Sequence, residues 1–346
     1  MLIFCATFRG IANPHRAPVK SYNLRFGVND LHAGDSVATN VYFIWEMIRP
    51  LLRGATTFCI PDSASYDPVA LVSLLAEHNI TETLMTPTLL AAVLLRHSNL
   101  ASKLPKLCSL WLNGEVVSTD LARRALKALP NTRLLNCYSA SETHEIACGD
   151  IGEMLPLLQA DAACCPVGPP MDPDHIYILD QEGKRVEAGT SGELFVGGEL
   201  LARGYLNLPE TTAKAFTPDQ FAKGGKKYCT GDMARILPSS GLLEITGRVG
   251  GMIKIRGYSV VPQVCEKAII DHLNVSNCAV IGSGEDVRRQ LVAYIVLEPT
   301  ADRTPFTIDE NGFSPSARQA LAPHLAHYML PTLWCPVGAL PTHEVS

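Results

Sequence analysis

Residues 81–115 read TETLMTPTLLAAVLLRHSNLASKLPKLCSLWLNGE, and they carry the clearest indication of the fold class. Its first part, 81–87, is typical of a short strand that ends at Pro87. Residues 86–98 carry apolar side chains at helical spacing, and residues 106–115 predict a second, buried strand. A strand, a helix and a further strand in this order are typical of parallel strands joined by a crossover helix. The stretch therefore predicts a parallel sheet that is covered by helices.

The same alternation continues on both sides of this stretch. Before it, residues 67–79 predict a helix with Asp67 as its N-cap. After it, residues 118–130 predict a capped helix, and residues 132–142 predict a strand that runs into a polar loop. The α/β pattern therefore extends from residue 36 to about residue 140.

The pattern changes twice further along the chain. After residue 150, short alternating strands are separated by Gly and Pro turns, and after residue 249 a hairpin, two helices and further strands follow. We therefore expect an α/β fold with a β-rich subdomain, followed by a small α+β domain. The expected boundaries are 1–150 for the α/β part, 151–249 for the β-rich subdomain and 250–346 for the small C-terminal domain.

Composition limits the class of partner. The net charge is −5 and the charges are mixed along the chain, without the basic stripe that nucleic acid or an anionic membrane would require. Apolar runs such as residues 89–95 are shorter than the roughly 18 residues of a transmembrane helix, so we expect no membrane span. The first residues lack the basic leader and the cleavage site of a secretory signal, and a cytoplasmic protein is the expectation.

The cysteines do not suggest a metal site or a disulfide framework. Eleven are scattered along the chain without CxxC spacing, so we expect reduced thiols. The adjacent pair Cys164 and Cys165 allows two interpretations, a plain loop or a redox-active pair.

Three polar segments follow predicted strands, where open α/β sheets bind ligands. They are NGE at 113–115, NCYSASE at 136–142 and TGD at 230–232. Glu142 can hold a divalent cation, and Asp232 can accept hydrogen bonds from a pair of ribose hydroxyls. Taken singly, an acid such as Glu142 is more often a solvated loop residue, and an aspartate such as Asp232 is more often a turn residue.

Four motifs in order point to one family. The segment 136–142 resembles an N-x-Y-G-x-T-E loop, and GELFVGGELLARGYLNLPETTAKAF at 192–216 resembles a G-E-L…A-R-G-Y block. YCTGD at 228–232 resembles Y-R-T-G-D, and GRVGGMIKIRGYSV at 247–260 resembles the hinge block G-R-x-D-x-x-K-x-x-G. Over nearly its whole length, the chain resembles the adenylate-forming superfamily. It looks closest to the adenylation domains of non-ribosomal peptide synthetases and of fungal synthetase-like carboxylate reductases.

The resemblance implies roles for individual residues toward ATP. Asp232 and Arg248 would hold the ribose hydroxyls, Ser141 would contact phosphate, and Glu142 would hold Mg²⁺. The residues expected at the adenine are Gly114, Glu115, Asn136, Tyr138 and Ser139.

The resemblance also implies the reaction. A small carboxylic acid attacks the α-phosphate of ATP, pyrophosphate leaves, and an acyl-adenylate forms with Glu142 as a catalytic residue. Residues 1–249 would be a partial N-terminal adenylation lobe. The domain 250–346 would be mobile and would turn about the hinge, so that the face carrying Lys254 meets a phosphopantetheine thiol from a carrier-protein domain or from coenzyme A.

Several positions depart from the family pattern. Arg9 stands at the place of the phosphate-loop lysine, and IFCATFRG at 3–10 lacks the Gly/Ser/Thr cradle. Gly250 replaces the usual hinge residue, and the chain stops before the final G-K-x-D lysine. The sequence therefore leaves three alternatives: an active adenylating chain truncated at both ends, an impaired AMP-binding remnant, or a gene-model fragment of a larger enzyme.

Two further observations bear on substrate and class. Val41 stands four residues before Trp45, where amino-acid-activating domains usually place an aspartate for the α-ammonium group. This favours a substrate without an α-ammonium group or with one held differently, unless Val41 is a plain packing residue. GSGEDV at 282–287 is a weak dinucleotide-binding signal, because it lacks the third glycine and the later acidic residue of an oxidoreductase site.

Overall fold

A computed structural model of the chain describes residues 2–4, 10–39, 43–159, 162–248, 253–255, 258–260, 262–284, 290–298 and 305–340. Contacts divide the chain into two compact units, Met1–Thr246 and Gly247–Ser346. Each unit has its own hydrophobic core. The identification of these parts as an adenylation lobe and a mobile domain stays a prediction.

A mixed sheet forms the centre of the first unit. In the described part of the chain this sheet has six strands in the order β4-β3-β5-β6-β7-β8. The strands are β3 (Ser36–Thr39), β4 (Thr56–Cys59), β5 (Glu82–Met85), β6 (Ser109–Leu112), β7 (Arg133–Ala140) and β8 (His144–Asp150). All neighbours are parallel except β7 and β8. The predicted parallel sheet is confirmed.

The strand predicted to run into a polar loop within 132–142 is β7, but only residues 141–143 form a turn, and the strand β8 that follows was not predicted. Thr143 donates its N–H to the carbonyl of Ala140 (3.1 Å), and His144 adopts a left-handed backbone with φ +59°. The chain therefore reverses within a tight turn and returns as the antiparallel strand β8. A left-handed histidine is uncommon, and this is why the sequence did not reveal the hairpin.

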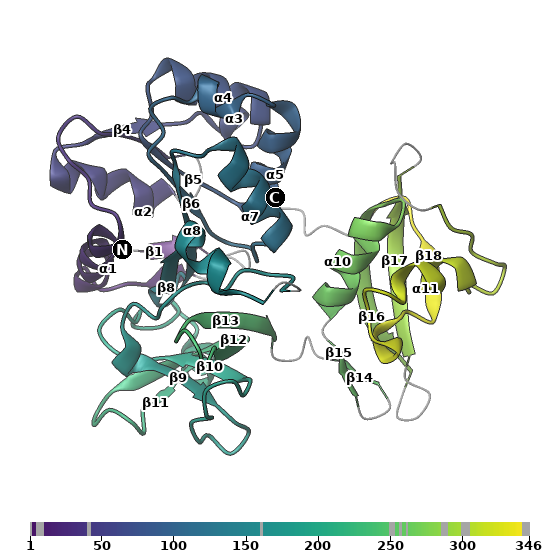
Figure 1. The fold of residues 1–346 in the computed structure, drawn as a ribbon. Coiled ribbons are helices and arrows are strands. Elements are labelled where there is room, and N and C mark those ends of the chain that lie inside the picture. Colours follow the sequence, from purple (N-terminus) through teal and green to yellow (C-terminus); the bar gives the residue numbers. More distant parts are fainter. Residues whose placement is uncertain are drawn as a thin grey trace. The chain divides into compact units, whose positions relative to one another are not determined.

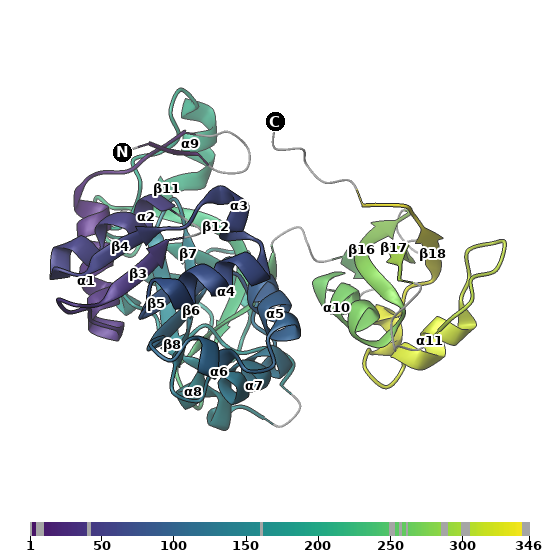
Figure 2. The ribbon, with the colours of Figure 1, turned by 90° about the horizontal axis from the view of Figure 1, so that it is seen from above.

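Helices cover both faces of the sheet. The helices of this part are α1 (Arg16–Val28), α2 (Phe43–Ile48), α3 (Asp62–Ser65), α4 (Pro68–Glu77), α5 (Pro87–Arg96), α6 (Leu100–Lys103), α7 (Thr119–Ala128) and α8 (Ile151–Met154), with 3₁₀ turns η1 (Pro50–Arg53) and η2 (Leu155–Leu157). Helices α4, α5 and α7 lie on one face and α1 lies on the other (Figures 1 and 2). The predicted caps are confirmed, because the Asp67 carboxylate accepts from the Val69 and Ala70 amides and the Ser118 hydroxyl accepts from the Leu121 amide.

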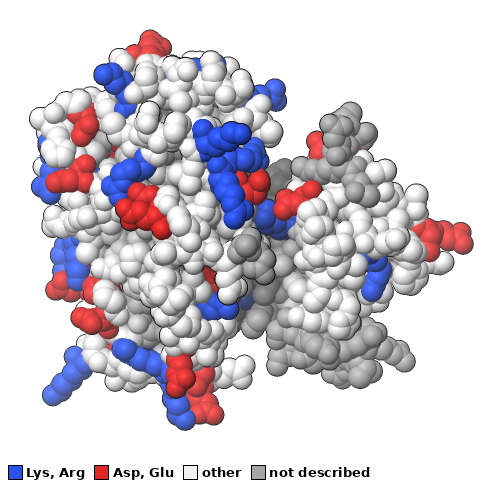
Figure 3. Space-filling model, in the orientation of Figure 1, with Lys and Arg blue, Asp and Glu red and all other residues white. Residues whose placement is uncertain are grey.

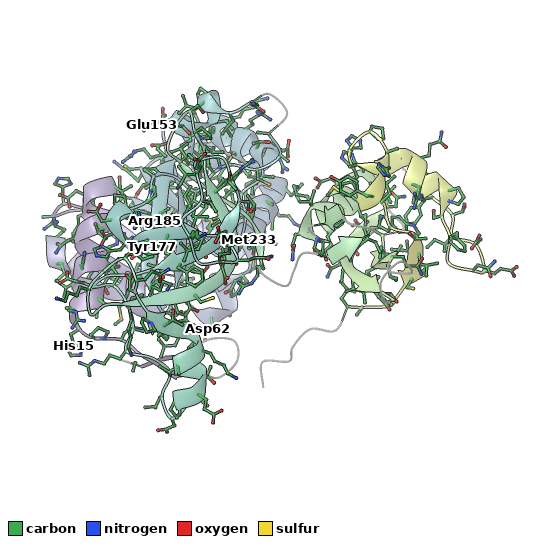
Figure 4. All side chains as sticks on the ribbon, turned by 90° about the horizontal axis from the view of Figure 1, so that it is seen from below. His15, Asp62, Glu153, Tyr177, Arg185 and Met233 are labelled. Carbon is green, nitrogen blue, oxygen red and sulfur yellow. The ribbon has the colours of Figure 1, made fainter. Side chains whose placement is uncertain are left out.

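The rest of the first unit is β-rich, as predicted. Its larger sheet has five described strands in the order β11-β12-β10-β9, with β13 also paired to β12. The elements are β1 (Leu2–Phe4), β2 (Gly10–Ala12), η3 (Pro173–His175), β9 (Ile176–Leu179), β10 (Gly192–Val196), α9 (Pro209–Ala215), β11 (Phe216–Pro218), β12 (Lys226–Ile236) and β13 (Leu243–Arg248). Arg185 lies over the ring of Tyr177, with 4.8 Å from Cζ to the ring centroid (Figure 4). The phenol of Tyr177 donates to the Asp219 carboxylate (2.9 Å).

The second unit has the α+β character that was predicted. It contains β14 (Ile253–Ile255), β15 (Tyr258–Val260), α10 (Pro262–His272), β16 (Val275–Ser283), β17 (Gln290–Leu297), α11 (Pro315–Leu321), η5 (His327–Met329) and β18 (Leu333–Pro336). Strands β14 and β15 form the expected hairpin, and β17 is the centre of a sheet with β16 and β18. Strand β18 pairs in parallel with β17 and was not predicted.

The surface and the helices of the described residues bear on partners. On the face shown in Figure 3, acidic and basic side chains are interspersed. In the described part of the chain, every helix is too short or too polar to cross a bilayer.

Gly27 offers a simple test of helix α1. It is an exposed helical residue, and a Cβ added there would meet nothing within 4 Å. Because glycine is the poorer helix former, Gly27→Ala should stabilise the first unit by about 0.5–1 kcal/mol. Thermal unfolding measures this, with Gly168→Ala as the contrast. Gly168 has φ +138°, and its Cβ would lie 2.3 Å from backbone atoms of Cys148 and Gly149, so that substitution should destabilise. An unchanged or lowered midpoint for Gly27→Ala would contradict the helix assignment.

Glu266 gives the second unit a pH dependence. Burial raises the pKa of this carboxyl, and the hydrogen bond from the Val280 amide (2.8 Å) only partly opposes the shift. A raised folded-state pKa contributes stability that is complete below the unfolded-state pKa and is lost as pH rises through the folded-state value. Glu266→Gln should therefore raise the urea midpoint of the second unit at pH 7, and this gain should vanish toward about pH 4. The exposed Glu310→Gln is the matched control. Equal gains at both pH values would refute this explanation.

Candidate functional site

The ends of β6 and β7 bring two of the predicted polar segments together. Leu112, the last residue of β6, pairs with Asn136 of β7, so the residues that follow β6 lie beside the last residues of β7. The Asn113 amide donates to the Ser139 hydroxyl (2.9 Å). Gly114 has φ +91°, a left-handed conformation that favours glycine at this turn.

The third predicted segment joins this edge through Asp232. The phenol of Tyr138 in β7 donates a hydrogen bond to Asp232 Oδ2 in β12. Asp232 is buried, and its own amide donates to the Thr230 hydroxyl (3.0 Å). The contact therefore places a carboxylate of the β-rich sheet beside an aromatic ring of the central sheet. A carboxylate next to a flat ring is suited to hold a ribose and to support a base.

Glu142 lies in the tight turn between β7 and β8. Its carbonyl accepts from the Ala202 amide (2.8 Å), and its Oε1 accepts from the phenol of Tyr205 (2.8 Å). The residue is only 9% exposed. Tyr228 lies near Glu142 and Tyr205; its burial, followed by the charge of Glu142, raises the pKa of this phenol well above its usual value.

Ser141 is held by the segment that leads into α1. The Asn13 side-chain amide donates to the Ser141 carbonyl (3.1 Å). Strand β2 is itself fixed, because the Ala12 amide donates to Gly204 (2.9 Å) and the Arg203 amide donates to Ala12 (2.8 Å). The backbone at 10–13 and the segment 203–206 therefore form one support under Ser141 and Glu142.

Two predicted residues have structural partners away from this group. The Asn136 amide donates to the Pro166 carbonyl (2.9 Å), and Asn136 is buried. Glu115 accepts from the backbone N–H of Thr88 (3.0 Å) and also from its hydroxyl, at the start of α5. Their expected places beside the adenine stay predictions.

The remaining predicted positions lie in the second unit or outside the described residues. Arg248 is exposed at the end of β13 and falls in the second unit. The backbone of Lys254 lies in β14, and its side chain is outside the described part. Arg9, Val41 and Gly250 are also outside the described residues.

The donor set around Glu142 fits a magnesium ion that is shared with phosphate groups. Mg²⁺ prefers oxygen ligands and usually takes one or two protein carboxylates together with phosphate oxygens and water. Glu142 supplies one buried carboxylate, with the Ser141 hydroxyl next to it in the chain. Within the described ranges, no group of three or more His, Cys, Asp or Glu residues gathers into an all-protein metal cage.

Three residues of the site had no role in the sequence analysis: Asn13, Tyr205 and Tyr228. Tyr205 and Tyr228 occur as letters of the A-R-G-Y and Y-x-T-G-D motifs, so the signal was present without a function attached. Asn13 gave no such signal, because a single amide before a helix has many possible uses.

A buried charge cluster lies beside the site, between α1, α2 and the sheet. The Arg25 guanidinium donates to both oxygens of Glu46 and lies 3.7 Å from Glu145, and its Cζ is 4.4 Å from the Trp111 ring centroid. Arg49 donates to Glu82 and lies 3.8 Å from Glu46. The Glu145 carboxylate also accepts from the Ser21 hydroxyl. Glu145 follows Glu142 by three positions, so the cluster anchors the strand that leaves the site.

The adjacent cysteines at 164–165 are not disulfide-bonded. Burial raises the pKa of Cys165 to about 12, which makes it a poor nucleophile at neutral pH. The plain structural interpretation is therefore favoured for this pair.

Comparison with known proteins agrees with this arrangement. Residues 19–206 match the family model described as AMP-binding enzyme. The chain is 64% identical over 342 residues to the glycine betaine reductase ATRR of Emericella nidulans, with 98% of this chain and 27% of that protein covered. It is 31% identical over 338 residues to bacitracin synthase 2 of Bacillus licheniformis, with 96% and 12% covered. The chain therefore spans about a quarter or less of these relatives.

Solved structures show the same fold. The O-succinylbenzoate coenzyme A synthetase of Bacillus subtilis, in complex with ATP and magnesium ion, superposes with a TM-score of 0.79 at 17% identity, covering 96% of this chain and 64% of that one. The family model alone covers more than half of the 346 residues. The chain belongs to the AMP-binding enzyme family and has the fold of the adenylate-forming enzymes.

Proposed function

We propose that this chain activates a carboxylic acid with ATP, forming an acyl-adenylate and pyrophosphate. The observation that carries the proposal is the hydrogen bond between Tyr138 and Asp232, with Glu142 one tight turn away from Tyr138. This hydrogen bond joins Asp232, the carboxylate proposed to hold the ribose, to the segment 136–142, which is proposed to bind the adenine and the cation. The family match supports the same reaction.

In this proposal different residues of the site bind different parts of the nucleotide. Asp232 and Arg248 hold the ribose hydroxyls. The adenine lies beside Gly114, Glu115, Asn136, Tyr138 and Ser139. The Ser141 hydroxyl donates to a phosphate oxygen, and Glu142 holds Mg²⁺. The bound ion disperses the negative charge that develops on the phosphates as the acid attacks.

We propose a quaternary ammonium carboxylate, glycine betaine in the first instance, as the acid. The relative that is 64% identical is named for the reduction of glycine betaine. A trimethylammonium group is still a cation but has no N–H to donate, so it would be held differently, without the hydrogen-bonding aspartate that many amino acids require. Valine at position 41 agrees with such a substrate.

We further propose that the acyl group passes to a phosphopantetheine thiol, on a carrier domain or on coenzyme A. This step rests on the resemblance of residues 247–260 to the hinge block and on Lys254 within it. Synthetases among the relatives are much longer chains, with room for further domains.

ATP–pyrophosphate exchange with a panel of acids tests the proposal. We expect exchange with glycine betaine and little with glycine, which has the same carboxylate but a primary ammonium group. Exchange with neither acid, in a chain that still binds AMP, would instead support the nucleotide-binding remnant. The lack of a Gly/Ser/Thr cradle at 3–10 is the observation that favours this second candidate.

A further inference from the structure

Two tyrosine side chains lie beside the carboxylate of Glu142. Tyr205 donates its phenol hydrogen to Oε1 (2.8 Å), and the phenol of Tyr228 lies near enough to both Tyr205 and Glu142 for each to raise its pKa. Tyr205 is 8% exposed, Tyr228 is 8% exposed and Glu142 is 9% exposed, so water can reach this group only slightly. The three residues come from separate segments: the β7–β8 turn, the segment before α9, and strand β12.

Both rings are held by packing that does not involve Glu142. Tyr205 contacts Phe216 edge to face with centroids 5.8 Å apart, and Phe216 contacts Tyr228 at 4.9 Å. The Tyr205 backbone forms a bridge with Ile11, and its amide donates to the Thr212 hydroxyl (2.9 Å). The phenol oxygens are therefore presented from rigid positions.

The backbone of Glu142 is fixed as well, because its carbonyl accepts from the Ala202 amide (2.8 Å). The remaining freedom is the direction of the carboxylate. A buried carboxylate without donors is costly, and the phenol of Tyr205 satisfies it, with the ring of Tyr228 beside it, while restricting its rotation. Hydrogen-bonded partners of metal-binding carboxylates orient them in this way.

We propose that Tyr205 and Tyr228 are positioning residues, which hold the Glu142 carboxylate in the orientation that receives Mg²⁺. The inference rests on the proposed function and adds to it two residues that act through Glu142. Neither phenol needs to touch the nucleotide. Their loss should therefore weaken the response to the metal and leave metal-free nucleotide binding unchanged.

The test is the Mg²⁺ dependence of nucleotide binding by the full 346-residue chain. ATP binding is measured calorimetrically over a range of Mg²⁺ concentrations and in EDTA, for wild type, Tyr205→Phe and Tyr228→Phe. Each variant loses one oxygen atom and keeps its ring. We expect the half-saturating Mg²⁺ concentration to rise about tenfold, the lower end of the range for lost hydrogen-bonding partners of a metal ligand. Affinity in EDTA should not change, and high Mg²⁺ should restore wild-type binding.

Tyr177→Phe is the matched control. It also removes a buried phenol that donates to a carboxylate, that of Asp219 (2.9 Å), in the β-rich part of the same unit. Tyr177→Phe should lose about as much stability on thermal unfolding as Tyr205→Phe and Tyr228→Phe. It should nevertheless leave the Mg²⁺ dependence of ATP binding unchanged.

The other outcomes are decisive. If Tyr205→Phe and Tyr228→Phe are destabilised like the control and keep the wild-type Mg²⁺ dependence, the two phenols are structural only and the inference is wrong. Equal weakening of binding with and without Mg²⁺ would also overturn it. If one variant fails to fold, the other variant provides the test, measured over the same range of Mg²⁺ concentrations. Wild-type protein that binds nucleotide without any response to Mg²⁺, or does not bind it, would overturn the proposed function and the inference together.

Discussion

Asp232→Ala should reduce acid-dependent ATP–pyrophosphate exchange by about a hundredfold or more. A hydrogen bond to a charged group contributes roughly 1.5–3 kcal/mol, and each 1.4 kcal/mol corresponds to a factor of ten. Two ribose hydroxyls would lose their acceptor, and Tyr138 would lose the partner that ties β7 to β12. The loss should appear in kcat/KM for ATP, measured with saturating acid.

Two further variants separate the parts of this effect. Asp232→Asn keeps the shape and removes the charge, so it should lie between wild type and alanine. Tyr138→Phe keeps the ring and removes the hydrogen bond to Asp232, so its loss should be smaller than that of Asp232→Ala. Wild-type exchange by a folded Asp232→Ala variant would exclude Asp232 from the nucleotide site.

Arg25→Met should destabilise the first unit by about 3–5 kcal/mol, the usual consequence of removing one partner from a buried ion pair. Arg25 and Glu46 are both almost fully buried. Burial acts to lower the pKa of Arg25, but the carboxylates of Glu46 and Glu145 outweigh burial and raise it. The substitution would leave Glu46 and Glu145 buried without this cation. Urea unfolding of the first unit measures the loss.

Double substitution distinguishes the ion pair from simple packing. Arg25→Met combined with Glu46→Met should recover part of the lost stability, because it leaves fewer uncompensated buried charges. The exposed pair Arg53 and Asp30, 2.8 Å apart, is the control, and Arg53→Met should change stability far less. A loss for Arg25→Met no larger than that for Arg53→Met would contradict the importance of the buried cluster.

The same charge cluster makes the stability of the first unit depend on pH. Burial pushes the pKa of Glu46 upward, but Arg25 and Arg49 more than offset this and hold it below its usual value. A lowered folded-state pKa contributes stability that is present above the unfolded-state pKa and is lost as pH falls through the folded-state value. The cluster therefore stabilises the first unit at neutral pH and less in acid.

The central sheet could be predicted because its residues repeat a simple pattern. Leu110 and Leu112 of β6 face the core beneath α4, α5 and α7, and Trp111 faces the opposite side. A strand buried on both faces is continuously apolar, and the helices between such strands show helical spacing. These signals lie within short segments, so they are readable without tertiary information.

The buried charges could not be predicted for the opposite reason. Arg25 and Glu46 stand in segments where charged residues normally face solvent. Their burial depends on partners that are distant in sequence, such as Glu145, and on the ring of Trp111. Only the folded chain brings these groups close enough to neutralise one another.

The candidate site was predictable in part. The polar segments at 113–115, 136–142 and 230–232 were expected to meet, and contacts such as Asn113 to Ser139 bring them together. The individual partners were not predictable, since Asn136 donates to Pro166 and Glu115 caps α5, contacts that depend on loop paths. Tyr205 and Tyr228 look like ordinary core aromatics, because the sequence does not show where a phenol hydrogen points.

The most direct test of the account is detection of the acyl-adenylate itself. The chain is incubated with ATP, Mg²⁺ and glycine betaine, quenched, and examined by mass spectrometry beside Asp232→Ala. We predict an adduct of betaine and AMP with pyrophosphate released, and far less of both products from the Asp232→Ala variant. A folded wild-type chain that, with every acid of the exchange panel, leaves ATP intact or hydrolyses it to ADP would contradict acid adenylation as its function.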